Sequence, residues 1–252
     1  MESEINKAVE LILSSSHTTV FTGAGISVES GIPPFRGKDG LWSKYDPQIL
    51  DISYFYSNPG KSWKVIREIF YDFFGKAEPN HAHKAIALME QSGFIKTVIT
   101  QNIDGLHQAA GSKNVLEFHG TSKSLTCTEC GEKYEASEIS LDEIPPKCKK
   151  CNGLLKPDFI FFGEPIPEPA GTLSFEEAEK SDLFIVVGTS GEIMPASLIP
   201  IEAQRNGAKI IEINKNPSNY TAEELPDIFL QGKATEVFAE LMKALKNKGK
   251  KE

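Results

Sequence analysis

Short apolar segments alternate with amphipathic segments along most of the 252-residue chain. Several short segments are apolar at almost every position, which is typical of strands buried on both faces of a sheet. We expect strands at residues 18–22, 97–100, 115–118, 183–187, 209–213 and 228–230. Helical periodicity predicts helices at residues 5–13, 62–74, 81–91, 175–180, 195–206 and 235–246. This alternation predicts an α/β fold with a doubly wound parallel sheet.

Two stretches interrupt the alternation and suggest how the chain is divided. Residues 120–157 predict a small domain inserted into a large one, which would comprise residues 1–119 and 158–252. Residues 31–59 are rich in glycine, proline and aromatic side chains, and predict a flexible loop. The following residues, 60–80, predict a helical insert in the large domain.

All four cysteines of the chain lie in the inserted segment, in the pattern C-x2-C-x17-C-x2-C. They are Cys127, Cys130, Cys148 and Cys151. Two thiolates spaced by two residues can bind one ion from a tight turn, and two such turns complete a tetrahedron around Zn²⁺. Two disulfides are the alternative, which we do not expect because the N-terminus does not resemble a signal peptide. A redox role is also disfavoured, since redox C-x2-C motifs usually occur singly.

Four thiolates leave no open position for water, so the predicted zinc ion is structural. Such a ribbon on its own would also suit nucleic acid, so the metal does not name a function. The chain has 27 basic and 35 acidic residues and a net charge of −8, which disfavours a general phosphate-backbone binder and suits cationic partners. No apolar run approaches the roughly 20 residues that cross a bilayer. We therefore expect a soluble cytoplasmic protein with neither a membrane nor a nucleic-acid partner.

A glycine-rich turn, Gly-Ala-Gly-Ile-Ser at residues 23–27, follows the first predicted strand. Such a turn brings backbone N–H groups to a pyrophosphate at a helix N-terminus. The dinucleotide fingerprint G-x-G-x-x-G is incomplete, because residue 28 is valine. A tight structural turn is the alternative interpretation of this segment. The missing glycine argues against an ordinary NAD dehydrogenase.

A set of motifs occurs in a fixed order along the chain, namely GAGISVESGIPPFR at 23–36, TQNIDGLH at 100–107, His119-Gly120, the four cysteines, FGE at 162–164 and GTS at 188–190. This ordered set resembles the sirtuin family of NAD-dependent protein-lysine deacylases. The resemblance runs from about residue 23 to residue 234 in the family's order. It implies a Rossmann-like NAD-binding domain with an inserted zinc-ribbon domain, and NAD bound between the two.

The resemblance also implies which residues contact NAD. Those assigned to the phosphates, ribose and adenine are Gly23, Ala24, Gly25, Arg36, Gly188, Thr189, Ser190, Asn214 and Ala234. Those assigned around nicotinamide and the reactive ribose are Ala24, Ile26, Phe35, Gln101, Asn102, Ile103 and Asp104. In this scheme Asp104 accepts from the carboxamide, Asn102 orients a water or the ribose, and Phe35 shields the ribose from water.

His119 is the expected general base, because a neutral imidazole near pKa 6.5 suits removal of a ribose hydroxyl proton at pH 7. A half-buried structural histidine at a strand end is the alternative. By resemblance, the acyl oxygen attacks the ribose C1′ as nicotinamide departs. His119 then activates the 2′-hydroxyl, and the products are free lysine, nicotinamide and 2′-O-acyl-ADP-ribose.

The resemblance places an acyl-lysine peptide between the two domains, paired with extended backbone. The residues assigned to it are Phe162, Gly163, Glu164, Gly191, Glu192 and Ile193. The acidic side chains among them favour lysine-rich substrates. Tyr-x-x-Arg, carried by sirtuins that prefer acidic acyl groups, is missing from the sequence, so we expect acetyl or longer apolar acyl groups. We expect a monomer. Mono-ADP-ribosyl transfer and a binding module without turnover are the alternative functions.

Overall fold

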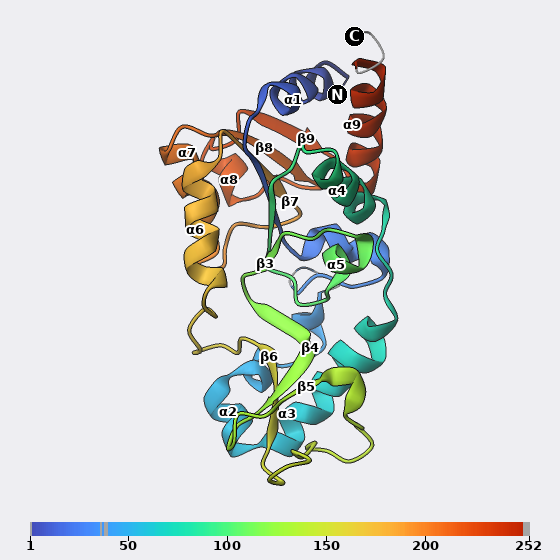
Figure 1. The fold of residues 1–252 in the computed structure, drawn as a ribbon, viewed down its shortest axis with the longest axis vertical. Coiled ribbons are helices and arrows are strands. Elements are labelled where there is room, and N and C mark those ends of the chain that lie inside the picture. The colour runs from blue at the N-terminus through green and yellow to red at the C-terminus, as the bar shows by residue number, and fades with distance from the viewer. Residues whose placement is uncertain (1, 36, 38–39, 249–252) are drawn as a thin grey trace.

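The computed structural model describes residues 2–35, 37 and 40–248. Six strands form one parallel sheet in the order β3-β2-β1-β7-β8-β9 (Figure 1). The strands are β1 (Thr18–Thr22), β2 (Thr97–Thr100), β3 (Val115–Glu117), β7 (Leu183–Val187), β8 (Lys209–Asn214) and β9 (Ile228–Gln231). All six were predicted, each to within one residue at either end, and the doubly wound parallel fold is confirmed.

Helices cover both faces of this sheet because its strands are apolar on both sides. Val20, Ile185 and Val187 face a core shared with α1 (Glu2–Ser14), α4 (His81–Gln91) and α9 (Ala234–Lys248). Their neighbours along the strands, such as Phe21 and Phe184, face the opposite core with α6 (Ala170–Lys180) and α7 (Leu198–Arg205). Figure 1 shows α4 and α9 on one side of the sheet and α6 and α7 on the other.

Several helices differ from the sequence-based prediction. The segment predicted as one helix at 62–74 is α3 (Pro59–Ile66) followed by π-helical residues Arg67–Phe73. α6 begins five residues earlier than predicted, and α7 is shorter than predicted at both ends. The stretch 31–59 contains α2 (Ile52–Ser57), and two further short helices, α5 (Leu106–Ala110) and α8 (Asn219–Ala222), were not predicted. Helices of four to six residues are too short for periodicity to reveal.

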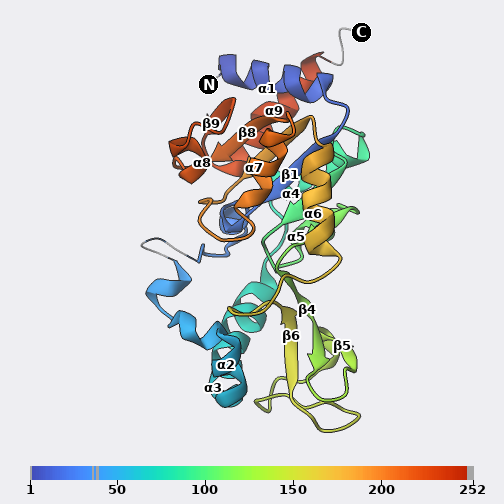
Figure 2. The ribbon, with the colours of Figure 1, turned by 90° about the vertical axis from the view of Figure 1, so that its left-hand side faces the viewer.

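The cysteine segment forms a second, antiparallel sheet in the order β5-β4-β6. Its strands are β4 (Gly120–Cys127), β5 (Lys133–Glu135) and β6 (Leu155–Phe159). An apolar core joins this sheet to α2 and α3, and Figure 2 shows all of these elements together, away from the large sheet. No helix in the described part of the chain is long and apolar enough to cross a membrane.

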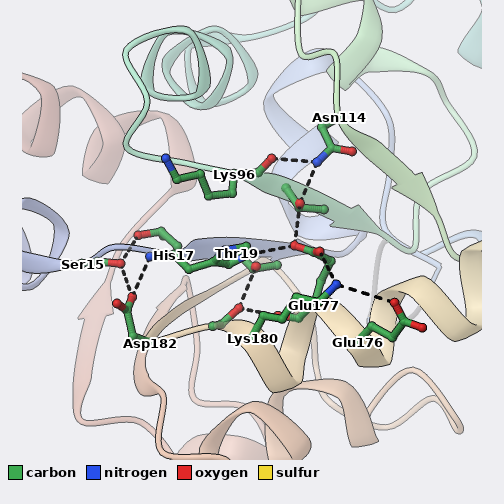
Figure 3. A network of polar contacts seen from close by, with 12 residues as sticks. Ser15, His17, Thr19, Lys96, Asn114, Glu176, Glu177, Lys180 and Asp182 are labelled. Atoms are coloured by element: carbon green, nitrogen blue, oxygen red, sulfur yellow. Dashed lines mark hydrogen bonds and ion pairs between the residues drawn. The ribbon is translucent and has the colours of Figure 1, made fainter.

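A polar network ties the amino ends of the central strands together (Figure 3). Glu177 of α6 accepts hydrogen bonds from His17 Nε2 at 2.9 Å and from Thr97 Oγ1 at 2.8 Å. Asp182 accepts from the backbone N–H groups of Ser16 and His17. Polar groups at this end of the sheet therefore bond to one another.

Candidate active site

A cavity of about 940 Å³ lies at the carboxyl ends of the parallel strands. It extends from the turns after β1, β7, β8 and β9 to the apolar core beside the small sheet. It brings together most residues that the resemblance assigned to NAD, namely Gly23, Ala24, Gly25, Phe35, Gln101, Asn102, Ile103, Gly188, Thr189, Ser190, Asn214 and Ala234, and also His119. Ile26 and Asp104 are buried and are not among the residues that line the cavity. Arg36 lies outside the described residues.

The glycine-rich turn packs against the end of β7 without room for side chains. The amide of Gly23 donates to Val187 O at 2.9 Å, and the amide of Gly25 donates to Gly188 O at 2.8 Å. A Cβ on Gly188, whose φ is +62°, would lie 2.5 Å from the amide nitrogen of Ile26. These two amides are therefore not the phosphate donors that the motif suggested. The glycines instead allow the backbones of the two turns to approach one another closely.

His119 lines the cavity, and its imidazole is oriented by one backbone group. Its Nδ1 lies 3.1 Å from the carbonyl oxygen of Gln101. Because a carbonyl only accepts, Nδ1 carries the proton and Nε2 retains a free lone pair. Desolvation lowers the pKa of His119, and this outweighs the opposing effect of the Gln101 bond. The ring is therefore a neutral base at neutral pH.

Asn102 and Asp104 are held by a buried polar cluster. The Asn102 amide nitrogen Nδ2 donates to Gly23 O at 3.1 Å and to Ser27 Oγ at 3.2 Å. Asp104 accepts from Ser27 Oγ at 2.7 Å and from the backbone N–H of Leu106 at 2.9 Å. Burial raises the pKa of Asp104, although these hydrogen bonds favour its ionised form. Both side chains are thereby held in place by neighbouring protein groups.

The residues assigned to the peptide divide into two groups. Phe162, Gly163, Glu164 and Ile193 line the cavity, whereas Gly191 and Glu192 do not. Glu164 forms an ion pair with Lys156 at 3.0 Å and accepts the backbone N–H of Phe161 at 2.7 Å. Its carboxylate is therefore already paired within the protein.

The four cysteines converge on one point of the small sheet. Their Sγ atoms all lie within 4.8 Å of one another, with Cys127–Cys151 at 3.5 Å and Cys130–Cys148 at 3.7 Å. A zinc–sulfur bond of about 2.3 Å implies sulfur–sulfur separations of about 3.8 Å in a tetrahedron. A disulfide would bring two sulfurs to about 2.0 Å, and all four thiols are free. The donor set fits one structural zinc ion.

Other cavity residues were missed by sequence reasoning. Lys215, Asn216 and Pro217 follow Asn214 directly, so the strand-end argument that selected Asn214 extends to them. No local sequence pattern predicts the residues at the apolar end of the cavity, where it meets the core beside the small sheet. These residues come from distant segments of the chain that share one core. They are Leu50, Phe70, Phe159 and Phe161.

Comparisons with known proteins agree with this geometry. Residues 23–195 match the model of the Sir2 family. NAD-dependent protein deacylase 2 of Archaeoglobus fulgidus is 47% identical over 252 residues, which cover 98% of each chain. NAD-dependent protein deacetylase 1 of Pyrobaculum aerophilum is 42% identical over 245 residues, 96% of this chain and 95% of that one.

Solved structures show the same fold. A Sir2 homologue in complex with NAD is 40% identical, with a TM-score of 0.88 over 96% of this chain and 94% of that chain. A Sir2–p53 peptide–NAD⁺ structure is 34% identical, with a TM-score of 0.87 over 94% of this chain and 96% of that chain. The motifs, the fold and these relatives lead to one conclusion: the chain belongs to the Sir2 family.

Proposed function

We propose that this protein removes acyl groups from protein lysines with consumption of NAD, releasing nicotinamide and 2′-O-acyl-ADP-ribose. The relatives named above are NAD-dependent deacylases and deacetylases, and a structural neighbour holds both NAD⁺ and a peptide. The observation that carries the proposal is the orientation of His119, whose Nε2 is left to accept a proton at the wall of a cavity of about 940 Å³.

Each group of residues has a distinct task in this reaction. NAD, when bound, supplies the activated glycosidic bond and the ribose that receives the acyl group. His119 Nε2 accepts a proton from a hydroxyl placed beside it. Asn102 orients the groups around the ribose, and Phe35, whose ring lies 5.5 Å from that of Trp42, excludes water from the same place.

The apolar end of the cavity suits an uncharged acyl group. Phe70 packs on Phe159, with ring centroids 5.0 Å apart, and both line the cavity. Arg67 is turned away, since its guanidinium donates to Leu141 O at 2.6 Å and pairs with Asp72 at 3.3 Å. Among the described residues, no cation lines this end. We therefore propose acetyl or longer apolar acyl groups as substrates.

We further propose that the protein is a cytoplasmic monomer that prefers lysine-rich segments. The net charge of −8 supports the preference for cationic substrates. Glu164 is already paired with Lys156. The proposed preference for lysine-rich segments therefore rests on the attraction between the net negative charge of the protein and positively charged substrates. Mono-ADP-ribosyl transfer would use the same cavity, but the peptide- and NAD-bound neighbour favours deacylation.

The test is incubation of the protein with acetyl-, myristoyl- and succinyl-lysine peptides, with and without NAD, with products identified by mass. We expect NAD-dependent loss of the acetyl or myristoyl group and appearance of O-acyl-ADP-ribose. Preferential desuccinylation would contradict the proposed acyl specificity. Protein-linked ADP-ribose without deacylation would establish the transferase instead.

A further inference from the structure

Two buried histidines lie behind the loop that carries Asn102. His83 of α4 and His107 of α5 are 0% and 1% exposed, and their ring centroids lie 4.9 Å apart in an edge-to-face contact. Burial lowers the pKa of His83 to about 4 and that of His107 to about 3. Both rings are therefore neutral at pH 7, each with one donor and one acceptor nitrogen.

The surroundings of His107 determine which nitrogen carries its proton. Nε2 lies 2.9 Å from Thr22 Oγ1, whereas Nδ1 has no hydrogen-bond partner among the described residues. A buried N–H without an acceptor is rarer and costlier than a bare lone pair. The proton is therefore on Nε2, which donates to Thr22.

From Thr22 the hydrogen bonds continue to the loop that carries Asn102. The hydroxyl of Thr22, on β1, donates to Thr100 Oγ1, on β2, at 2.9 Å. Thr100 Oγ1 also accepts the backbone N–H of Asn102 at 3.0 Å. The order His107, Thr22, Thr100, Asn102 thus links a buried ring to the backbone of a cavity residue. We call these four residues the threonine relay.

A second series of hydrogen bonds lies next to the threonine relay. His83 Nδ1 accepts the backbone N–H of Asn80 at 3.4 Å, so its Nε2 is the donor and faces Ser27 Oγ at 3.4 Å. Ser27 in turn donates to Asp104 at 2.7 Å. The side chain of Asn102 connects the two series of hydrogen bonds, because its Nδ2 donates to Ser27 Oγ at 3.2 Å. The threonine relay therefore holds the backbone of Asn102, and the series of hydrogen bonds through His83 and Ser27 holds its side chain.

We propose that Thr22 and His107 are positioning residues for deacylation, which hold Asn102 in its reactive orientation through the threonine relay. The inference rests on the proposed function, since it assigns Asn102 the task of orienting groups at the ribose. Neither residue lines the cavity, so both act through Asn102. Loss of the Thr22 hydroxyl leaves the His107 N–H without an acceptor and frees the Thr100 hydroxyl to turn.

The test compares Thr22→Val with Thr22→Ser and with the matched control Thr19→Val. Thr19 is a buried threonine on the same strand, bonded to Ser181 instead of the relay. We expect Thr22→Val to lower kcat about tenfold, which corresponds to about 1.4 kcal/mol in the barrier, with the peptide KM unchanged. Thr22→Ser, which keeps the hydroxyl, restores kcat, and Thr19→Val remains near the parent protein. His107→Phe, which removes the N–H but keeps a ring, should lower kcat to the same extent as Thr22→Val.

A readout independent of turnover is hydrogen exchange of the Asn102 amide. We expect faster exchange in Thr22→Val than in the parent protein, and parent-like exchange in Thr19→Val. The relay is wrong if Thr22→Val behaves like Thr19→Val in both assays, or if Thr22→Ser is as slow as Thr22→Val. A parent protein without deacylase activity would overturn the proposed function, while exchange at Asn102 would still test the relay.

Discussion

The Nδ1 atom of His119, just beyond the end of β3, lies 3.1 Å from the backbone oxygen of Gln101, just beyond the end of β2. This single contact fixes the tautomer of the imidazole and leaves Nε2 as the nitrogen that can accept a proton. The side chain of Gln101 donates to Thr189 Oγ1 at 3.0 Å beside the glycine turn. The segment that orients the imidazole of His119 thus also contacts the turn after β7.

Replacement of the base provides the first prediction. His119→Ala is expected to lower kcat about 100-fold or more, because a positioned general base contributes about that much. NAD binding, measured by calorimetry, should change little, since the glycine turn is untouched. Deacylation that survives the substitution at the parent rate would remove His119 from the mechanism.

The pH dependence of the parent protein tests the same residue. Burial lowers the pKa of His119 below its ordinary value of 6.5. Because the imidazole accepts a proton only in its neutral form, the midpoint of the decline of kcat/KM in acid should lie below pH 6.5. A profile of kcat/KM against pH measures this, and a midpoint above pH 6.5 would contradict the assigned environment of the ring.

The turn at Gly188 packs closely against the glycine-rich turn at residues 23–27, and this packing provides a prediction about NAD binding. Gly188→Ala places a Cβ 2.5 Å from the Ile26 amide nitrogen, so the glycine turn must shift and NAD affinity should fall. Gly207→Ala is the matched control, since Gly207 also has a positive φ (+95°) but a Cβ added there would meet nothing within 4 Å. The control carries only the backbone cost of about 1–2 kcal/mol. Thermal unfolding and NAD titration of both variants separate strain from lost binding, and equal NAD affinities would refute the argument.

The cysteine cluster has a neighbour that should stabilise bound zinc. Tyr134 OH lies 3.3 Å from Cys148 Sγ, close enough to donate to the thiolate. Such outer contacts typically change metal affinity by about 10-fold or more. Tyr134→Phe should therefore release zinc to a chelator faster than the parent protein, in a colorimetric assay.

The control for this variant is Tyr56→Phe, which alters an exposed tyrosine of α2. The parent protein should contain one zinc ion per chain by elemental analysis, and removal of that ion should unfold the small sheet. Equal release rates for the two tyrosine variants would show that the Tyr134 hydroxyl does not support the metal.

Glu177 makes the amino end of the large sheet sensitive to acid. Desolvation opposes its ionisation, but hydrogen bonds from His17 and Thr97 outweigh that effect and hold the pKa of Glu177 below its usual 4.5. A lowered pKa in the folded state adds stability above pH 4.5, and this contribution is lost as the pH falls through the folded value. Glu177→Gln should cost about 1 kcal/mol at pH 7, and the difference should shrink in acid.

Glu176→Gln is the matched control, because its carboxylate is half exposed and pairs only with Lys180 at 3.6 Å among the described residues. Denaturant unfolding at pH 7 and at pH 3.5 measures both variants. A cost for Glu177→Gln that is equal at both pH values would show that ionisation of Glu177 does not contribute.

Local signals explain which parts of the fold were predictable. Buried parallel strands are apolar at successive positions, so Leu183–Val187 and its neighbours stand out in the sequence. The π-helical turn at Arg67–Phe73 follows no such pattern, because helical periodicity does not distinguish it from an α-helix. The cysteine spacing indicated the metal site, since both halves of the site are local turns.

By itself, then, the sequence determined the layered α/β architecture, the cysteine cluster and the family, because each rests on spacing within a short segment. Tertiary structure alone decided that Glu164 pairs with Lys156, that His119 faces Gln101 O, and that His83 and His107 meet behind Asn102. Each of these contacts joins groups from different elements, or depends on the direction in which a side chain leaves its backbone. Folding sets those directions through packing of the whole core, and no local pattern of residues records them.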